Sequence, residues 1–114
     1  MNALKNKVQL IGNLGMNPEV RVIDGGRKLA KFSMAIHENY KNAKGEWVKQ
    51  TQWHNIVAWG KAADLVEAKL QKGNEVMIEG KLVHREYTDK EGVKRHFTEV
   101  QMIELLLMSH NKAS

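Results

Sequence analysis

The chain has 114 residues, of which 42% are hydrophobic and 27% are charged, as in an ordinary globular protein. It contains no cysteine and no apolar run of membrane-spanning length, which excludes a disulfide scaffold, a thiolate zinc site and a transmembrane helix. Lys and Arg outnumber Asp and Glu by 18 to 13, and the net charge of +5 mildly favours a polyanionic partner. No membrane partner is expected. No repeat or linker divides the sequence, so we expect one domain over residues 1–114.

Alternating apolar and polar residues between Gly- and Asn-rich stretches predict six extended segments. They cover residues 7–11, 20–23, 28–38, 47–59, 74–88 and 93–108. The first two are expected to be one long strand, broken by a turn before Pro18. Asp24-Gly25-Gly26 predicts a tight hairpin turn, since glycine accepts the positive φ that such a turn needs. A polar hairpin loop is expected over residues 39–46 and a turn over residues 89–92, and residues 103–108 are apolar enough to be buried on both faces.

One helix is predicted to begin at Gly60, with Gly73 as its left-handed C-cap. Its apolar stripe has helical spacing and consists of Ala62, Leu65, Val66 and Leu70. Three strands, a helix and two more strands are typical of a mainly-β, five-stranded Greek-key barrel of the oligonucleotide-binding type, with the helix between strands 3 and 4. An α+β antiparallel sheet covered by one helix is the alternative that this pattern leaves open.

No arrangement of reactive residues predicts an enzyme or a metal site. The serines lie in no nucleophile motif, and the histidines lack the paired spacing of metal ligands. Gly60-Lys61 resembles the end of a phosphate-binding loop, but Ala62 replaces the hydroxyl residue that such a loop needs. We therefore expect no catalysis, no metal and no cofactor.

The three tryptophans all have odd numbers on one predicted strand, so period two places them on one face together with Lys49. They are Trp47, Trp53 and Trp59. Exposed rings beside a lysine suit single-stranded nucleic acid, because every base can stack on an aromatic ring, at about 1–3 kcal/mol per base. The alternative is that these indoles fill a small core.

The other basic and aromatic residues are spread along the chain. Tyr40, in a polar loop, and Tyr87, just before a turn, are expected on the surface. Lysines and arginines occur on nearly every strand or loop, which suits a nucleic-acid backbone that wraps around the protein and predicts salt-sensitive binding. No basic helix of recognition length is present, so readout of a duplex major groove is not expected.

Several sequence blocks, in order and spacing, resemble the bacterial-type single-stranded DNA-binding proteins. The blocks are Asn6–Gly15, Pro18–Arg21, Thr51–His54, Gly60–Ala63, Leu70–Gly73 and Ile78–Leu82. The resemblance implies an oligonucleotide-binding barrel that assembles as a homotetramer. It also implies a cytoplasmic protein, associated with the bacterial nucleoid, that binds and protects single-stranded DNA without sequence preference in replication, recombination and repair.

The same resemblance implies roles for individual residues. Positions at which the family stacks bases correspond to Tyr40, Trp53, Trp59 and Tyr87. Phosphate contacts are expected at Lys7, Arg21, Lys49, Lys61, Lys72 and Arg85. Oligomer contacts are expected at Val8, Leu10 and His54, the last with a structural and not a catalytic role.

Family members that recruit replication and repair proteins carry a tail with an acidic, hydrophobic tip, whereas this chain stops at Ser114 without one. Either the chain was trimmed or it is a short member, and in the second case recruitment through a tail is not expected. Three alternatives stay open: a tailless primosomal-type dimer that bridges protein partners on DNA, a barrel used only for protein interaction, and binding of RNA.

Overall fold

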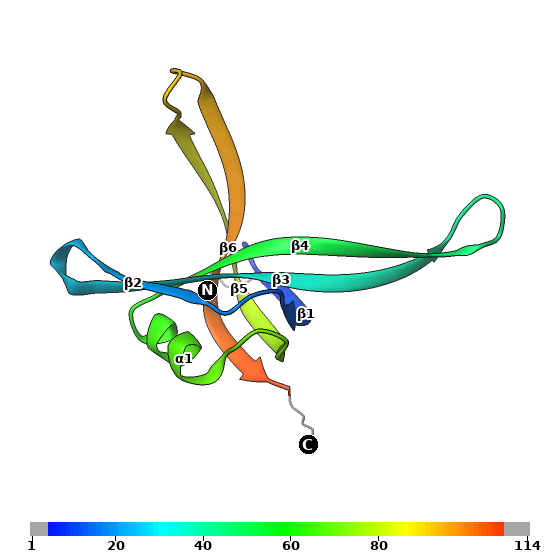
Figure 1. The fold of residues 1–114 in the computed structure, drawn as a ribbon, viewed down its shortest axis with the longest axis horizontal. Helices are drawn as coiled ribbons and strands as arrows, with labels where there is room; N and C mark the ends of the chain where they lie inside the picture. Colours follow the sequence, from blue (N-terminus) through cyan, green and yellow to red (C-terminus); the bar gives the residue numbers. More distant parts are fainter. Residues whose placement is uncertain (1–4, 109–114) are drawn as a thin grey trace.

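The computed structural model describes residues 5–108, which form a closed β-barrel with one helix and two long hairpin arms (Figure 1). The strands are β1 (Val8–Leu14), β2 (Glu19–Ile23), β3 (Arg27–Lys41), β4 (Trp47–Trp59), β5 (Glu75–Thr88) and β6 (Lys94–Leu107), and the helix is α1 (Lys61–Lys69). Within residues 5–108, no helix combines the length and the apolar character needed to cross a membrane. The end of the chain at Ser114 lies outside the described residues, and the single-domain organisation of residues 1–114 stays a prediction.

The barrel is closed where β1 pairs with β3. The sheet order is β1-β5-β6-β4-β3-β2, and β1 has this additional partner. Leu14 of β1 pairs with Met34, and Glu19 of β2 pairs with Lys31, so β1 and β2 follow one another along the same edge of β3. They act as one strand bent at residues 15–18. This confirms the five-stranded oligonucleotide-binding barrel predicted from the sequence, and the open α+β sheet is not the fold.

The core fills the barrel and continues under α1. Side chains alternate along a strand, so Phe32, Met34 and Ile56 point inward and are buried. Ala63 and Val66 of α1 belong to the same buried cluster. The helix therefore packs against the barrel and leaves the outer face of β3 and β4 uncovered.

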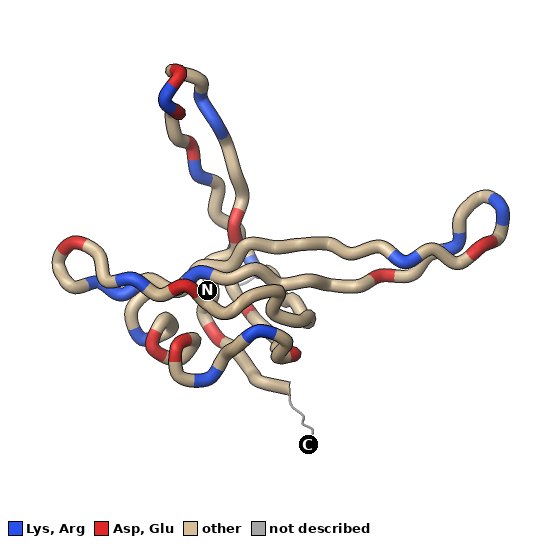
Figure 2. The backbone as a smooth tube through the Cα atoms, viewed as in Figure 1, with Lys and Arg blue, Asp and Glu red and all other residues tan. Residues whose placement is uncertain are grey.

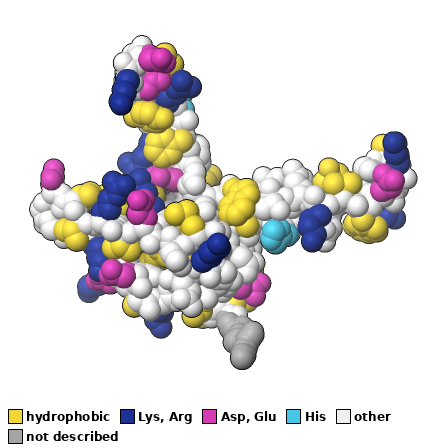
Figure 3. Space-filling view, viewed as in Figure 1, with side chains coloured by type: hydrophobic (Ala, Val, Ile, Leu, Met, Phe, Trp, Pro, Cys, Tyr) yellow, Lys and Arg dark blue, Asp and Glu magenta, His cyan; other side chains and the backbone are white. Residues whose placement is uncertain are grey.

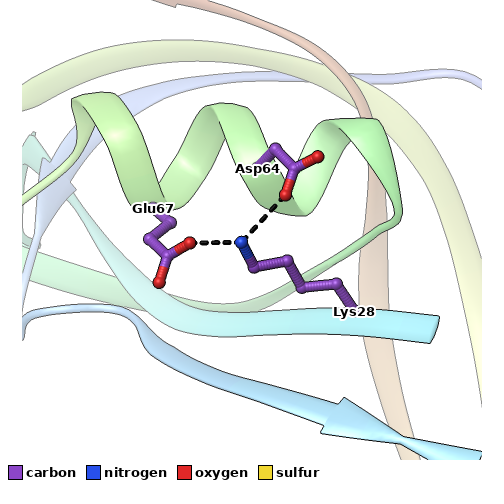
Figure 4. Close-up of polar contacts among 3 residues, drawn as sticks. All are labelled: Lys28, Asp64 and Glu67. Atoms are coloured by element: carbon purple, nitrogen blue, oxygen red, sulfur yellow. Dashed lines mark hydrogen bonds and ion pairs between the residues drawn. The ribbon is translucent and has the colours of Figure 1, made fainter. Parts of the chain in front are cut away.

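Lys28 of β3 connects the barrel to α1 (Figure 4). Its ammonium group donates hydrogen bonds to Asp64 Oδ1, at 2.8 Å, and to Glu67. The two carboxylates lie three residues apart, which places them on the same side of the helix. The side-chain hydrogen bond to Asp64, and then that to Glu67, raise the pKa of Lys28 above its usual 10.5.

The β3–β4 and β5–β6 hairpins extend beyond the barrel as two arms (Figure 1). One side chain organises the turn at each tip. Asn42 Oδ1 accepts hydrogen bonds from two backbone N–H groups of its turn, at 2.9 and 3.0 Å, and Asp89 Oδ1 does the same in the other arm, at 2.9 Å. The backbone N–H of Val93 and then the Arg95 guanidinium lower the pKa of Asp89.

Two local predictions, for the end of β1 and for the helix C-cap, differ from the structure. β1 does not end at the Gly/Asn-rich stretch, because Gly12 allows the Ala35 carbonyl to approach so closely that a Cβ would lie 2.5 Å from its oxygen. Gly73 is not the helix C-cap, since α1 ends at Lys69. Gly73 instead has φ +92° in the following turn, where its N–H donates to the Leu14 carbonyl at 3.0 Å.

The prediction that residues 103–108 are buried on both faces is wrong. Ile103 and Leu106 are 57% and 59% exposed, and Leu107 is also exposed. Leu105 points to the other side and packs against the core. The apolar outer side of this sheet is not covered by any part of residues 5–108.

Candidate nucleic-acid interface

The outer face of β2, β3 and β4 carries a connected set of aromatic and charged side chains. Its residues alternate with those that point into the core. Strand pairing arranges them in rows, which are Arg21–Leu29–Trp59, Glu19–Lys31–Val57, Ser33–Asn55 and Ala35–Trp53. Trp47, Trp53 and Trp59 all belong to this face of β4, as period two predicts.

Trp59, the last residue of β4, is half-buried, and Arg27 lies over its ring. The guanidinium carbon is 4.3 Å from the ring centroid, which is a cation–π arrangement. A guanidinium plane in this position can stack on a base and also donate to a phosphate. The site therefore combines a ring and a cation before any ligand binds.

Trp53 is 60% exposed and lies across the bend between β1 and β2. A Cβ on Gly15 would collide with atoms Cζ3 and Cη2 of this indole, the latter at 2.7 Å. The backbone N–H of Gly15 donates to the Ser33 carbonyl at 3.0 Å, which fixes the bend. The absent side chain of Gly15 thus provides the space in which Trp53 lies, with much of its ring open to solvent.

The β5–β6 arm adds a second set of rings to the interface. Tyr87, 51% exposed, and Phe97, 38% exposed, form an edge-to-face pair with their centroids 5.8 Å apart and an interplanar angle of 68°. Phe97 pairs directly across the strands with Arg85. The exposure of these rings and of the β4 tryptophans argues against the alternative in which the aromatics fill the core.

Arg85 is held by a buried carboxylate. Its Nε donates to Glu99, whose side chain is 5% exposed. A carboxylate so deeply buried needs a charged partner, because an unpaired charge in that position is costly. Glu99 therefore determines where the Arg85 guanidinium lies.

Three cavities lie along this face and share lining residues from one to the next; together we call them the groove. The first cavity, about 290 Å³, and the second, about 230 Å³, share Lys31, Phe97 and Glu99. The third, about 630 Å³, shares Trp59 with the second and includes Lys61. The groove runs from the β1–β2 bend, past the root of the β5–β6 arm, to the start of α1.

The β3–β4 arm carries exposed rings near its tip. Trp47 is 71% exposed, and the Lys41 ammonium is 5.5 Å from its ring centroid. Lys49 is exposed on the same face. Tyr40, 46% exposed, lies on the opposite face, and it belongs to β3 and not to the loop expected from its polar neighbours. The arm therefore presents rings on both sides. Figure 3 shows hydrophobic patches along the arm from one side.

The residues expected to bind phosphate fall in different places. Arg85 and Lys61 line the groove, and Arg21 lies on the same face, where it pairs with Glu19 at 3.4 Å. Lys7 pairs with Glu79 at 3.6 Å, and Lys72 lies in the turn after α1; neither lines the groove. Figure 2 shows the basic residues distributed over the barrel and both arms, interleaved with acidic ones.

Sequence reasoning assigned no role at this site to Arg27, Lys31 and Phe97. A signal for Phe97 was present, because a hairpin that turns at residues 89–92 places it opposite Arg85. For Lys31, period-two counting along residues 28–38 separates outward from inward positions once Phe32 is taken as core, whereas Arg27 lies just before that predicted segment.

The residues expected at an oligomer interface lie away from the groove. Val8 and Leu10 are half-buried and pack against the core. Within the described chain, residues 8–12 of β1 pair only with β5, which leaves their other edge open. His54 is half-buried on β4, opposite Met34. Their role in assembly stays a prediction.

Comparison with known proteins identifies relatives of this chain. The model of a family described as the single-strand binding protein family matches residues 5–108. Single-stranded DNA-binding protein 1 of Chlorobaculum tepidum is 41% identical over 104 residues, which are 90% of this chain and 64% of that relative's length. The solved Plasmodium falciparum SSB complex with ssDNA has a TM-score of 0.85 and 30% identity, with 91% of this chain and 95% of that chain covered.

Proposed function

Because the chain belongs to the single-strand binding protein family, as its sequence resemblance predicted, we propose that it binds single-stranded DNA without sequence preference. The observation that carries this proposal is the groove, in which Trp59 and Phe97 lie beside Arg27, Lys31 and Arg85. Unpaired bases stack on the rings, and phosphates pair with the neighbouring cations.

Base stacking and phosphate pairing recognise different parts of the strand. Stacking contributes about 1–3 kcal/mol per base and is tolerant of sequence, since all bases present a flat face. Phosphate contacts release counterions. For a single strand, each contact therefore makes the decline of log affinity with log salt steeper by about 0.7. Trp47 and Trp53 extend the stacking surface from the groove along the β3–β4 arm, and Tyr40 adds a ring on the opposite face of the arm.

The role that follows is protection of single strands during replication, recombination and repair, by binding and without catalysis. The similarity to a bacterial single-stranded DNA-binding protein supports a place on nucleoid DNA in the cytoplasm.

Assembly into a homotetramer, with a dimer as the alternative, is supported by two features on the side away from the groove. The free edge of β1, which includes Val8 and Leu10, offers unpaired backbone groups to a second chain. Ile11, Met77 and Leu106 lie side by side across β1, β5 and β6, where Ile11 and Leu106 are 45% and 59% exposed. An apolar sheet face of this kind is typical of an interface between subunits.

Competition between single and double strands tests the proposed function. A fluorescent dT oligomer is bound at low salt, and unlabelled dT, mixed-sequence DNA or a duplex of equal length is added. We expect both single strands to displace the probe equally well, the duplex to displace it poorly, and affinity to fall with salt. Equal displacement by the duplex, or no binding at low salt, would contradict the proposal. Adding an unlabelled RNA of equal length as a further competitor shows whether the protein discriminates between the sugars of DNA and RNA.

A further inference from the structure

Three polar side chains converge on the first cavity of the groove without partners of their own. Ser33 and Asn55 pair directly across β3 and β4, and Lys31 is the next residue along the same face. All three line the cavity. Within residues 5–108, their side chains make no hydrogen bond or ion pair. An amide, a hydroxyl and an ammonium group are thus available to one ligand.

The same cavity has aromatic and apolar walls. Phe97 lines it and is kept in orientation by its edge-to-face contact with Tyr87. Met16, 47% exposed, belongs to another wall, and Phe32, Ile56 and Val57 form the buried floor. A flat ring that stacks on Phe97 and turns its edge towards β3 and β4 satisfies these surfaces.

Charge indicates which part of a nucleotide enters. Two carboxylates, of Glu19 and Glu99, line the cavity, and they are paired with Arg21 and Arg85. Because these carboxylates already engage both arginines, a phosphate inside the cavity would meet acceptor oxygens instead of free donors. A neutral ring needs no free cation, while its phosphate can stay at the rim, where Lys31 is exposed.

From this arrangement we propose that the first cavity holds one unpaired nucleobase, with its ring on Phe97 and its hydrogen-bonding edge at Asn55 and Ser33. The volume, about 290 Å³, lies at the lower end of the roughly 300–1,000 Å³ of small-molecule pockets, which suits a single base. An asparagine amide offers donors and an acceptor side by side, so it can hydrogen-bond to the edge of a base. The inference rests on the proposed function and assigns a base-binding site within it.

An abasic scan combined with two variants tests the site. A dT oligomer of minimal binding length is prepared with one abasic residue at each position in turn, and its affinity is measured for the full-chain protein, Phe97→Leu and Asn55→Leu. We expect each variant to bind intact dT about fivefold more weakly, the loss of about one hydrogen bond or stacking contact. At one abasic position the same variants should bind as well as the unchanged protein, because the base they no longer contact is absent.

Tyr40→Leu is the matched control, since Tyr40 lies on the β3–β4 arm, and it should keep its full loss at that abasic position. Asn55→Asp, which places a third carboxylate at the cavity, should weaken intact dT more than Asn55→Leu does. Normal binding of dT by Phe97→Leu and Asn55→Leu, or an equal loss at every abasic position, would overturn the base site and leave the proposed function standing. Failure of the unchanged protein to bind any oligomer would overturn the proposed function itself.

Discussion

The Arg27 guanidinium lies 4.3 Å from the centre of the Trp59 ring, where the second and third cavities of the groove meet. One face of the indole is therefore covered by a cation before DNA binds. Strands β2 and β3 are joined at residues 24–26 by a tight turn, which keeps Arg27 at the start of β3 next to the ring. A base that stacks here meets ring and charge together, so the two contributions to affinity are coupled at this point.

Replacing this cation should change the salt dependence as well as the affinity. For Arg27→Ala we expect weaker dT binding and a slope of log affinity against log salt that is shallower by about 0.7, the value for one lost phosphate contact. Lys69→Ala removes the same charge from the exposed end of α1, outside the groove, and should leave the slope nearly unchanged. Equal slopes for the two variants would show that Arg27 does not contact phosphate.

The space above Gly15 can be closed by one methyl group. Gly15→Ala places a Cβ against the Trp53 indole and should displace the ring, with a loss of binding that approaches the about 1–3 kcal/mol of one stacked base. Trp53→Ala should lose a similar amount. The decisive comparison is the double variant: if Gly15 acts only through Trp53, the double variant binds dT no more weakly than Trp53→Ala alone, whereas additive losses would exclude this relationship.

Arg85 should contribute to stability and to binding through separate partners. Arg85→Ala leaves Glu99 buried without its cation and should lower the free energy of unfolding by about 1–3 kcal/mol, in addition to weakening dT binding. Adding Glu99→Gln removes the unpaired charge. Urea unfolding should then recover most of the lost stability while dT affinity stays low, and recovery of both would mean that Arg85 acts only on the fold.

The turn of the β5–β6 arm should respond to acid. Hydrogen bonds from the Val93 N–H and from Arg95 lower the pKa of Asp89 below its usual 3.8, so the ionised carboxylate stabilises the turn above that value. This stabilisation is lost as the pH falls through the lowered pKa. The amide resonance of Val93 should titrate with a midpoint below 3.8 and cease to titrate in Asp89→Asn; a midpoint at or above 3.8 would contradict the assignment.

The pKa of Lys28 is shifted in the opposite direction from that of Asp89, so its contribution to stability is lost at high pH. Because its hydrogen bonds to Asp64 and Glu67 raise its pKa, the stabilisation between β3 and α1 is present below 10.5 and is lost as the pH rises through the raised value. Lys28→Met should therefore lose less stability than the unchanged protein between neutral and high pH. Thermal unfolding over this pH range measures the difference. An unchanged alkaline decline in Lys28→Met would show that this contact does not govern it.

The exposed apolar face of β1, β5 and β6 predicts the behaviour of one further variant. Leu106→Glu places a charge in the row formed by Ile11, Met77 and Leu106, and should shift sedimentation from tetramer to a smaller species without unfolding the barrel. Gln71→Glu, at an exposed position in the turn after α1, adds the same charge away from this face as a comparison. A tetramer that persists in Leu106→Glu would exclude this face as the interface.

Much of the fold could be predicted because its signals are local. The Trp47–Trp59 strand agrees at both ends with the observed β4, and the turns at Gly25, Gly45 and Gly92 all have the positive φ that glycine permits. Period two also placed the three tryptophans on one face. These inferences need only the alternation of side chains and the conformational freedom of glycine.

The remaining differences arise from contacts between distant segments. The arm residues around Tyr40 are polar and exposed on both faces, and such a strand has the composition of a loop until its partner is known. The apolar end of β6 indicates burial but not whether this chain or another covers it. Phe97 and Asn55 meet at one cavity because β6 pairs in parallel with β4 next to them, at Ile56 and Val100, a relationship that spacing along the chain does not contain.

Stacking of exposed rings on unpaired bases is the central claim, and tryptophan fluorescence measures this stacking directly. Titration of the unchanged protein with dT oligomers at low salt should quench the emission strongly, and Trp53→Phe should remove a defined part of that quenching while retaining most of the affinity. Binding of dT with no change in tryptophan emission would contradict stacking on Trp53 and Trp59 and, with it, the central claim.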